Sequence, residues 1–439
     1  MQDIDIVYLY EHATRELDVA CAITSILQQQ HGLRVEIIQW PHGFHRVAGR
    51  IHPRVVVVPF CYTERSYPTC LMEWRKAAFF NLTWEQLFYK GNLKAKTPRG
   101  DFAVNHVIHH SWSDRYASFL REQGILEDHI FVNGQPAYTL YNEPYRQYFE
   151  QQADLAAQHG LDMTKTWVFF PENYNWAFYS EATLNRFIQD GQSPDDVFAM
   201  KDFCTRSFQE VIKWLCDLAG HDQIEVIVRP RPSTSLAEFR AAVRRIIPSI
   251  PERLRIIQDK SVREWIMASD IVLSSHSTSL IEAAVAGKLA HIVAPYPILA
   301  SLHQKWHTFV PRISTRQELL DVALHPSESA ADRRLEHWAH NTLMSRGDAI
   351  QNLAGYMARL CKGDIPAPPV PPRQSVTPPG RIPLPKWFLF EYRRIRYQKI
   401  RQTPAKKIEP EYVKDMVNSA EIENRVSRWG QVLAGGRRA

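Results

Sequence analysis

Hydroxyl side chains gather between a predicted strand and a predicted helix. Ile271–Leu273 is an apolar run typical of a buried strand, and a helix is expected from about Leu280 to Gly287. Five of the six residues between them carry hydroxyl groups: Ser274, Ser275, Ser277, Thr278 and Ser279. The first turn of a helix offers free N–H groups and a partial positive charge, so this turn is suited to bind phosphate. The simpler alternative is that the hydroxyl groups only cap the helix.

A carboxylate lies close to this turn. Glu282 falls near the start of the expected helix. There it could accept hydrogen bonds from ribose hydroxyl groups, as the acidic residue of a dinucleotide-binding fold does. The turn and Glu282 together therefore suggest a nucleotide site.

Strands and helices alternate in two series, with a polar helical stretch around residues 143–159 between them. Each series favours a parallel sheet covered by helices on both faces, because buried parallel strands read as continuous apolar runs. The expected strands are 4–10, 34–40, 54–60 and 130–132 in the first series, and 167–170, 224–228, 254–257, 271–273 and 290–294 in the second. In such sheets ligands bind at the carboxyl ends of the strands.

Two loops at such strand ends carry candidate reactive groups. Glu172 directly follows the strand 167–170 and is the first candidate for acid, base or nucleophile; an exposed acid in a polar loop is the alternative. Tyr174 and Trp176 in the same loop could stack on an acceptor sugar. The loop after the first strand of the chain holds the runners-up, Glu16 and Asp18. Arg15 also lies there, and a surface ion pair with Glu16 is the simpler reading.

Residues 61–110 are rich in aromatic side chains and show no regular pattern. His106, His109 and His110 lie close together in this stretch. No carboxylate or cysteine pattern completes a metal site around them, so we favour solvated or core histidines.

Length and composition limit the protein class. The chain has 439 residues, enough for two domains, and 45% of them are apolar. It contains no run of 18 uncharged apolar residues and no basic-then-apolar start, so we expect neither a membrane-spanning helix nor a signal peptide. The six cysteines form no C-x-x-C pair, which favours reduced cytosolic thiols over disulfides or a zinc site.

The positive charge is concentrated near the carboxyl terminus. Nine of the Lys and Arg residues and one acid lie in 381–407, so the net charge of +6 leaves about −2 for the rest of the chain. A general nucleic-acid-binding surface is therefore not indicated.

Nine prolines between residues 365 and 385 predict an extended linker. Aromatic and basic residues alternate in 386–407, which suits an anionic membrane surface. The alternatives are a helix packed on the body or an acidic partner.

The chain resembles GT-B glycosyltransferases of bacterial surface polysaccharide synthesis. The Ser/Thr run leading into Glu282-Ala283 is similar to that of Kdo transferases, polysialyltransferases and glycerophosphotransferases. Arg229-Pro-Arg-Pro232 stands where these families have His-Pro, which is a departure. Arg15-Glu-Leu-Asp18 and Asn133-Gly-Gln-Pro136 resemble surface carbohydrate biosynthesis proteins. The resemblance covers about residues 4–345.

This resemblance implies an α/β GT-B fold, with two Rossmann-like domains facing a central cleft, and specific roles for residues. Residues 1–150 would form the acceptor domain, 151–360 the donor domain, 361–385 the Pro-rich linker and 386–439 a basic membrane-associating tail. His276 could restore the acid that is lost when arginine replaces histidine. Donor nucleotide and phosphate would be bound by Arg229, Arg231, Ser274, Ser275, Ser277, Thr278 and Glu282, catalysis would use Glu172, His276 and Asp18, and the acceptor would meet Arg15, Glu16, Tyr174 and Trp176.

The implied activity is transfer of a sugar from a nucleotide-activated donor to a lipid-linked or oligosaccharide acceptor. A CMP-linked ulosonic acid such as Kdo is the favoured donor, and UDP-sugars come second. No cofactor is expected, and no metal, since Asp195-Asp196 lies at a helix start and not in a D-x-D context. The location would be cytoplasmic, at the inner face of the membrane. A UDP-sugar 2-epimerase and a non-catalytic polysaccharide-assembly protein are the alternatives.

Overall fold

The structure is a computed structural model. It describes residues 4–40, 43–44, 47, 49–63, 67–89, 92–231, 234–326, 333–372 and 415–435. The basic segment 386–407 and most of the predicted Pro-rich linker lie outside these ranges. Within the described residues, no helix is long and apolar enough to cross a membrane.

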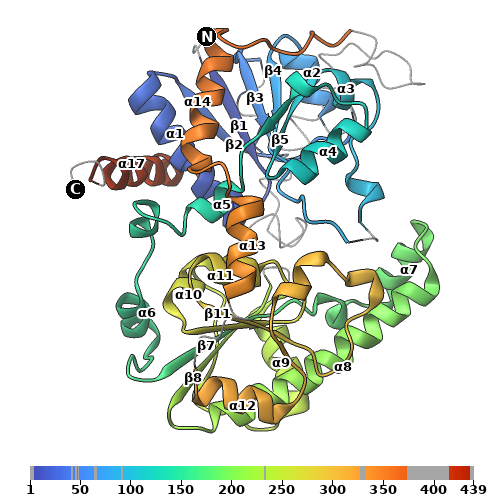
Figure 1. Cartoon of the computed structure of the whole chain (residues 1–439), viewed down its shortest axis with the longest axis vertical. Coiled ribbons are helices and arrows are strands. Elements are labelled where there is room, and N and C mark those ends of the chain that lie inside the picture. The colour runs from blue at the N-terminus through green and yellow to red at the C-terminus, as the bar shows by residue number, and fades with distance from the viewer. Residues whose placement is uncertain are drawn as a thin grey trace. The chain divides into compact units, whose positions relative to one another are not determined.

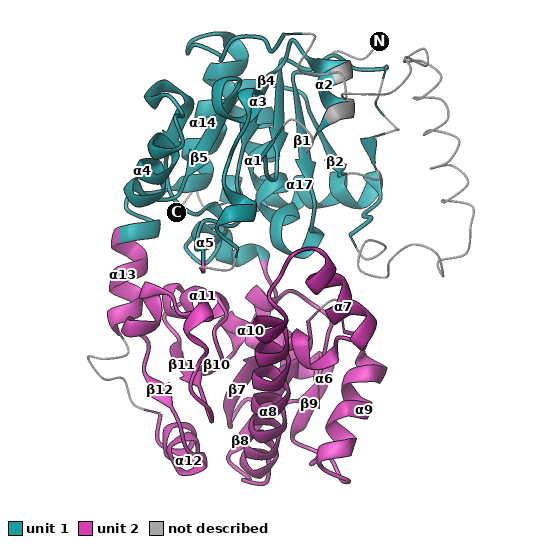
Figure 2. Ribbon diagram, turned by 90° about the vertical axis from the view of Figure 1, so that its right-hand side faces the viewer, with its two compact units in different colours: residues 1–88, 92–148, 342–439 teal, residues 89–91, 149–341 magenta. Residues whose placement is uncertain are grey.

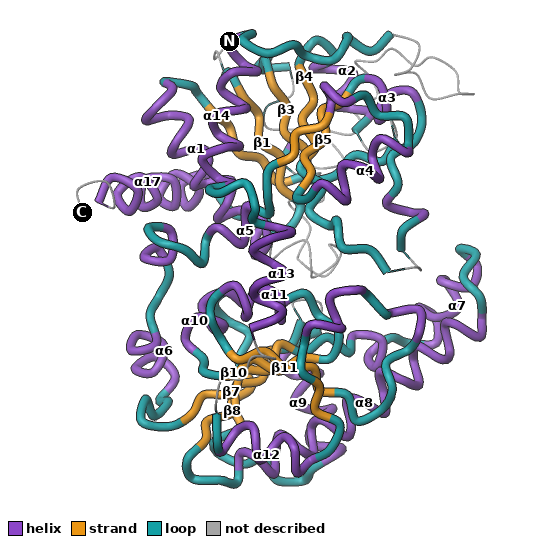
Figure 3. Tube along the Cα trace, viewed as in Figure 1, coloured by secondary structure: helices purple, strands orange, loops and turns teal. Residues whose placement is uncertain are grey.

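The chain forms two compact units. Unit 1 contains residues 1–88, 92–148 and 342–439, and unit 2 contains residues 89–91 and 149–341 (Figure 2). Each unit has one sheet of six parallel strands with helices packed on it (Figure 3).

The sheet of unit 1 has the strand order β2-β1-β3-β4-β5-β6. β3 consists of four valines that are completely buried, as expected for a strand covered on both faces. The strands are β1 (Ile6–Tyr10), β2 (Val35–Gln39), β3 (Val55–Val58), β4 (Ala78–Asn81), β5 (Val107–Ser111) and β6 (Ile130–Val132).

Helix α1 (Asp18–His31) is buried along most of its length. Every residue from Asp18 to Leu27 is buried, because α14 and α17 both pack against this helix (Figure 1). Gly32 ends the helix in the left-handed conformation, which glycine adopts without steric cost. The other helices of the unit are α2 (Pro68–Trp74), α3 (Asp101–Asn105), α4 (Asp114–Glu122), α5 (Pro136–Thr139), α14 (Ala349–Lys362) and α17 (Ser419–Gly435).

The sheet of unit 2 has the strand order β12-β11-β10-β7-β8-β9. Its strands are β7 (Thr166–Pro171), β8 (Ile224–Arg229), β9 (Leu254–Ile256), β10 (Ile271–Ser274), β11 (Leu289–Val293) and β12 (Arg312–Ile313). Its helices are α6 (Gln152–His159), α7 (Glu181–Gln189), α8 (Pro194–Ala219), α9 (Leu236–Ile246), α10 (Val262–Ala268), α11 (Ser279–Val285) and α12 (Arg316–Leu324), and α13 (Arg333–Leu343) ends at the boundary with unit 1.

Two strands of unit 1 occur where the sequence showed no pattern. β4 has only four residues. β5 contains His109 and His110, which interrupt the apolar pattern expected of a buried strand. Both histidines are fully buried and bonded: His109 to the Asn81 side chain and the Ala103 carbonyl, and His110 to the Leu82 carbonyl. Burial lowers the pKa of each to about 4, so both are neutral core residues.

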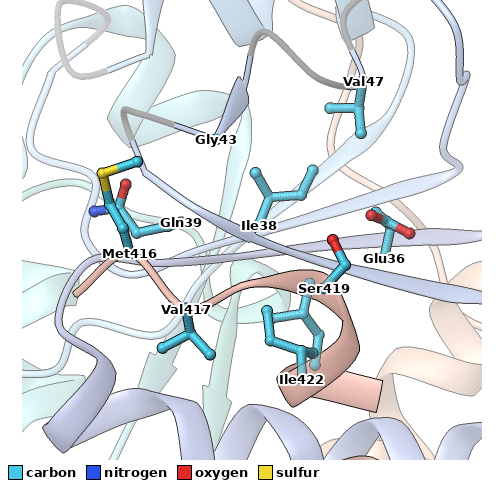
Figure 4. A pocket seen from close by; sticks show the side chains of 10 residues that line it. Glu36, Ile38, Gln39, Gly43, Val47, Met416, Val417, Ser419 and Ile422 are labelled. Atoms are coloured by element: carbon cyan, nitrogen blue, oxygen red, sulfur yellow. The ribbon is translucent and has the colours of Figure 1, made fainter. Parts of the chain in front are cut away.

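The carboxyl-terminal segments belong to unit 1, which corrects the predicted division of the chain. Residues 151–360 were expected to form one domain, yet α14 lies in unit 1. The expected tail, 386–439, also includes α17, which is a packed helix. Trp429 of α17 is completely buried and stacks on Tyr148, with ring centroids 4.0 Å apart. Residues before the helix line a cavity of about 20 Å³ together with β2 (Figure 4).

Candidate functional site

Three adjacent strands of unit 2 end in polar residues. β10, β7 and β8 are neighbours and run parallel, so their carboxyl ends lie at the same edge of the sheet. β10 ends with Ser274, β7 is followed by Glu172, and β8 ends with Arg229. This edge is where ligands bind in open parallel sheets.

Glu172 is a buried carboxyl group at this edge of the sheet. Its side chain is held by the backbone N–H of Tyr174, and Glu172 is only 3% exposed. The backbone N–H of Arg231 also acts on this carboxyl group. Burial is the main cause that raises the pKa of Glu172 to about 7, while the charge of Arg231 opposes the rise. A carboxyl group that titrates near neutrality can act as acid or as base.

The two predicted arginines have different environments. Arg229 was predicted beside the donor phosphate, but it is 5% exposed and its guanidinium donates to the carbonyl of Lys260 (2.9 Å). Burial lowers the pKa of Arg229 to about 10. Arg229 therefore holds the loop after β9. Arg231 is exposed, and its charge acts on both Glu172 and His276. Arg231 is therefore accessible to a ligand at this edge.

The first part of the hydroxyl-rich turn is bonded internally. Ser274 is buried and donates to the Pro171 carbonyl (3.1 Å). Ser275 is buried and lies 2.7 Å from Nδ1 of His276. Ser277 accepts from the Ser279 N–H (3.3 Å) and the Ser279 hydroxyl (2.8 Å), so helix capping accounts for part of the pattern.

The second part of the turn is open. Ser277 is half-buried, Thr278 is exposed, and Glu282 of α11 is half-buried. The Thr278 side chain makes no capping hydrogen bond to α11. The groups predicted for phosphate and ribose are thus brought to one edge with Arg231, and the turn is not sealed inside the unit.

His276 is neutral in this structure. Burial lowers its pKa to about 3, and the charges of His307 and Arg231 add to this effect. A neutral imidazole at physiological pH cannot donate as a general acid. The acid role predicted for His276 would therefore require the negative charge of a bound phosphate.

The loop after β7 contains one buried aromatic ring, Tyr174, and one partly accessible aromatic ring, Trp176. Tyr174 is completely buried, so it offers no face for a sugar, contrary to the stacking role predicted for it. Trp176 is half-buried and packs against Phe187, with centroids 5.0 Å apart. Lys201 of α8, which the sequence did not single out, donates to the carbonyls of Ala177 (2.9 Å) and Tyr179 (3.0 Å). The position of Lys201 on a long amphipathic helix did not indicate that it would bind the backbone of this loop.

The loop after β1 in unit 1 holds the other predicted residues. Glu16 is completely buried and pairs with Arg15, whose guanidinium also reaches Glu11 and Glu85. The expected surface pair is thus anchored on a buried acid, whose pKa is raised by that burial. Asp18 lies 3.4 Å from Arg425 of α17. No sequence feature indicated that partner, 407 residues away.

The described residues contain no group of three or more His, Cys, Asp or Glu side chains placed to hold a metal ion. The prediction that no metal is used is not tested by it.

Solved structures share the fold at low sequence identity. A variant of the wall teichoic acid polymerase TagF is 10% identical, with a TM-score of 0.54 over 82% of this chain and 89% of that chain. UDP-GlcNAc 2-epimerase from Neisseria meningitidis, bound to UDP-GlcNAc, is 10% identical, with a TM-score of 0.52 over 82% and 100%. A putative UDP-N-acetylglucosamine 2-epimerase from Listeria monocytogenes is 12% identical, with a TM-score of 0.51 over 84% and 100%.

These likenesses and the two parallel sheets confirm the predicted α/β GT-B fold with two Rossmann-like domains. They show the fold alone. No protein-family model and no curated protein matches the sequence. The finer resemblance to Kdo transferases and polysialyltransferases stays a prediction.

Proposed function

We propose that this protein is a glycosyltransferase that uses a nucleotide-activated sugar, with the donor bound by unit 2. The observation that carries this proposal is the edge where β10, β7 and β8 end. There, accessible Ser277 and Thr278, the cation Arg231 and the near-neutral carboxyl Glu172 come together. A leaving nucleotide phosphate gains negative charge, which fixed hydroxyl and guanidinium donors stabilise.

The donor that we place first is a CMP-linked ulosonic acid such as Kdo, because the Ser/Thr run before Glu282-Ala283 is similar to that of Kdo transferases. UDP-sugars come second. An epimerase is the competing activity, and the observation in its favour is the fold likeness to UDP-GlcNAc 2-epimerases. A non-catalytic assembly protein would bind nucleotide or glycan without turnover.

A thermal-shift panel of CMP, UDP, GDP and CDP tests the donor class. A nucleotide at 100 times its Kd stabilises the native state by about 2.7 kcal/mol through mass action. Release of nucleotide from the matching nucleotide-sugar only when a lipid-linked acceptor is added indicates transfer. Interconversion of two nucleotide-sugars without acceptor indicates an epimerase, and binding without either reaction indicates an assembly protein.

Glu282→Ala is expected to weaken nucleotide binding by about tenfold, since one charge-assisted hydrogen bond to ribose contributes roughly 1.5 kcal/mol. Isothermal titration calorimetry with the nucleotide found in the panel measures this change. Asp222→Ala, at an exposed acid on the turn before β8, is the control and should leave the affinity unchanged. Equal affinity of the Glu282→Ala variant and the wild type would remove Glu282 from the ribose site.

The acceptor that we propose is a lipid-linked or oligosaccharide glycan, with the protein on the cytoplasmic face of the inner membrane. The basis is the sequence of 386–407, where cations and aromatic rings alternate. Of the residues predicted to meet the acceptor, Trp176 and Arg15 are half-buried and keep part of their surface accessible.

Replacing the nine Lys and Arg residues of 381–407 by Gln should release the protein from anionic vesicles. Each cation near such a surface contributes about 1 kcal/mol, so the loss is expected to be nearly complete. Co-sedimentation with phosphatidylserine-containing vesicles measures it, and neutral phosphatidylcholine vesicles are the control. This substitution leaves α17 in place, whereas a deletion to residue 439 would remove a packed helix. Continued sedimentation of the substituted chain would refute the membrane role of this segment.

A further inference from the structure

The first residues of the Pro-rich segment are packed on unit 1. Residues 365–372 follow α14 and form neither helix nor strand. Pro368 and Pro371 are buried, whereas Pro369 and Val370 between them are exposed. A buried side chain at every third position fits a polyproline II helix, which has three residues per turn. The linker predicted from the sequence is therefore anchored at its start.

Two side chains of unit 1 contact the backbone of this segment. His106 Nδ1 lies 2.6 Å from the Pro369 carbonyl oxygen, and Arg75 Nη1 donates to the Pro371 carbonyl at 2.7 Å. Arg75 lies between α2 and β4, and His106 directly precedes β5. β4 and β5 are parallel neighbours, so the segment lies at the amino-terminal edge of the sheet. In Figure 1 it is the orange trace that leaves α14 and runs toward α2.

The ring of His106 faces an acceptor on each side. Nε2 lies 3.2 Å from Oδ2 of Asp101, while Nδ1 contacts the Pro369 carbonyl. A carbonyl and an ionised carboxylate can only accept hydrogen bonds, and a neutral imidazole has one N–H group. The imidazolium form has two, so it is the form of His106 that donates to both acceptors at once.

Asp101 and His129 are the titratable neighbours of His106 in the described part of the chain. The hydrogen bond from the Asn105 amide is the first cause that lowers the pKa of Asp101, and the charge of His106 adds to it, so the carboxylate is ionised. Burial is the first cause that lowers the pKa of His129, the charge of Asp128 opposes this effect, and the charge of His106 adds to it. A neutral His129 does not oppose a positive charge on His106.

We propose that His106 is a pH-sensitive anchor, whose imidazolium form holds residues 365–372 on unit 1 and whose neutral form loosens them. Docking that requires a proton is favoured at low pH and weakens as the pH rises through the range in which histidine titrates, from about 5 to about 8. The neutral ring can keep its bond to Pro369 only by turning the Nε2 lone pair toward Asp101. A charge-assisted hydrogen bond is thereby lost, so we expect the docking constant to fall about fivefold to tenfold.

The anchor also limits the chain that continues toward residues 386–407. A polyproline II chain spans 3.1 Å per residue, so release of residues 365–372 lengthens the connection from α14 by up to about 25 Å. This consequence for membrane contact rests on the membrane role proposed above. The anchor itself does not depend on that role or on the transferase activity.

A nitroxide label at position 370 measures the docking in the full-length protein. Val370 is 50% exposed, so Val370→Cys presents a thiol to the reagent, whereas the six native cysteines are buried. The EPR spectrum separates an immobile, docked population from a mobile one, and their ratio is followed from about pH 5 to about pH 8. The mobile fraction should increase with pH. A label that is mobile at every pH refutes the docking, and a ratio that does not change with pH refutes the anchor.

Substitutions in the labelled protein separate the roles of the side chains. His106→Gln should remove the pH dependence, and a dependence that persists in this variant overturns the role of His106. Asp101→Asn should keep the segment docked at pH 8, because its amide can donate to Nε2 while Nδ1–H donates to Pro369. Undocking of Asp101→Asn at pH 8 to the wild-type extent contradicts the argument from two acceptors. The matched control is Arg75→Gln, which removes a charge that is constant in this range and should raise the mobile fraction at low and high pH alike.

Two neighbouring prolines test which face of the segment is docked. Pro368→Ala and Pro369→Ala remove the same ring and the same backbone restraint, but Pro368 is buried and Pro369 is exposed. Pro368→Ala should therefore raise the mobile fraction more, and equal effects would overturn the three-residue spacing of the contact. The label reports docking without membranes, so a failed vesicle experiment would refute the membrane role and leave the anchor standing.

Discussion

Glu172→Gln is expected to stabilise the protein at pH 8 while it abolishes sugar transfer. Glu172 is 3% exposed, and burial raises its pKa from 4.5 to about 7. Between these two values the folded chain holds a proton that the unfolded chain has lost. The contribution of Glu172 to the stability of the wild type therefore falls as the pH rises from about 4.5 to about 7. Above pH 7 the carboxylate is ionised in both states, and the folded state bears the full cost of the buried charge.

Glutamine has nearly the same shape and no charge, and its carbonyl oxygen can still accept the Tyr174 N–H. The free energy of unfolding of the variant minus that of the wild type should thus be roughly 3 kcal/mol larger at pH 8 than at pH 4. This amount is the free-energy equivalent of the pKa change. Urea unfolding at both pH values measures the difference. A stability gain of this kind at a lost activity is the pattern of a residue kept for function.

The matched control is Glu181→Gln, at an exposed acid in the first turn of α7. Its stability difference from the wild type should be nearly the same at both pH values. Nucleotide binding by the Glu172→Gln variant should be retained, which separates a chemical role from a binding role. A Glu172→Gln variant that transfers sugar at the wild-type rate, or that shows no pH-dependent gain, would contradict this account.

The sheets could be predicted from the sequence because their strands are continuous apolar runs. β3 consists of four valines, and β10 begins with the apolar residues Ile271–Leu273. β5 could not be predicted, since the bonds that satisfy His109 and His110 come from Leu82 and other residues of neighbouring segments. Hydrophobic periodicity depends on residue types alone, so it cannot show which hydrogen-bond partners the fold brings to a polar side chain.

The candidate site could also be predicted only in part from the sequence. The turn after β10 was found from local sequence, since a helix start and its hydroxyl groups are neighbours in the chain. Sequence could not assign the different tasks of Arg229 and Arg231, because the carbonyl of Lys260 that engages Arg229 is 31 residues away. Asp415 was beyond reach for a stronger reason. Its contact with His12 depends on the packing of a helix that was expected to lie in a membrane-associated tail.

Trp429→Ala is expected to destabilise unit 1 by about 3–5 kcal/mol, the range for removal of a large buried aromatic side chain. Trp429 is completely buried, stacks on Tyr148 at 4.0 Å with an interplanar angle of 2°, and lies 6.0 Å from the ring of Tyr145. α1 loses part of its cover when α17 loosens. Hydrogen exchange measured by mass spectrometry should therefore accelerate in residues 18–27 and remain unchanged in α8 of unit 2.

Gly430→Ala is the neighbouring control. A Cβ at this position would meet Nε2 of Gln29 and, at 3.1 Å, Oγ of Ser25, both on α1. Gln29 is exposed and its amide can swing aside, so the expected cost is small compared with that of the tryptophan. α17 begins four residues after Asp415, whose carboxylate is hydrogen-bonded to His12. Trp429→Ala should therefore also lower the pKa of His12, which NMR of protein labelled at histidine Cε1 measures. If neither hydrogen exchange in residues 18–27 nor the pKa of His12 changed in Trp429→Ala, the prediction that the packing of α17 stabilises α1 and the His12–Asp415 contact would be wrong.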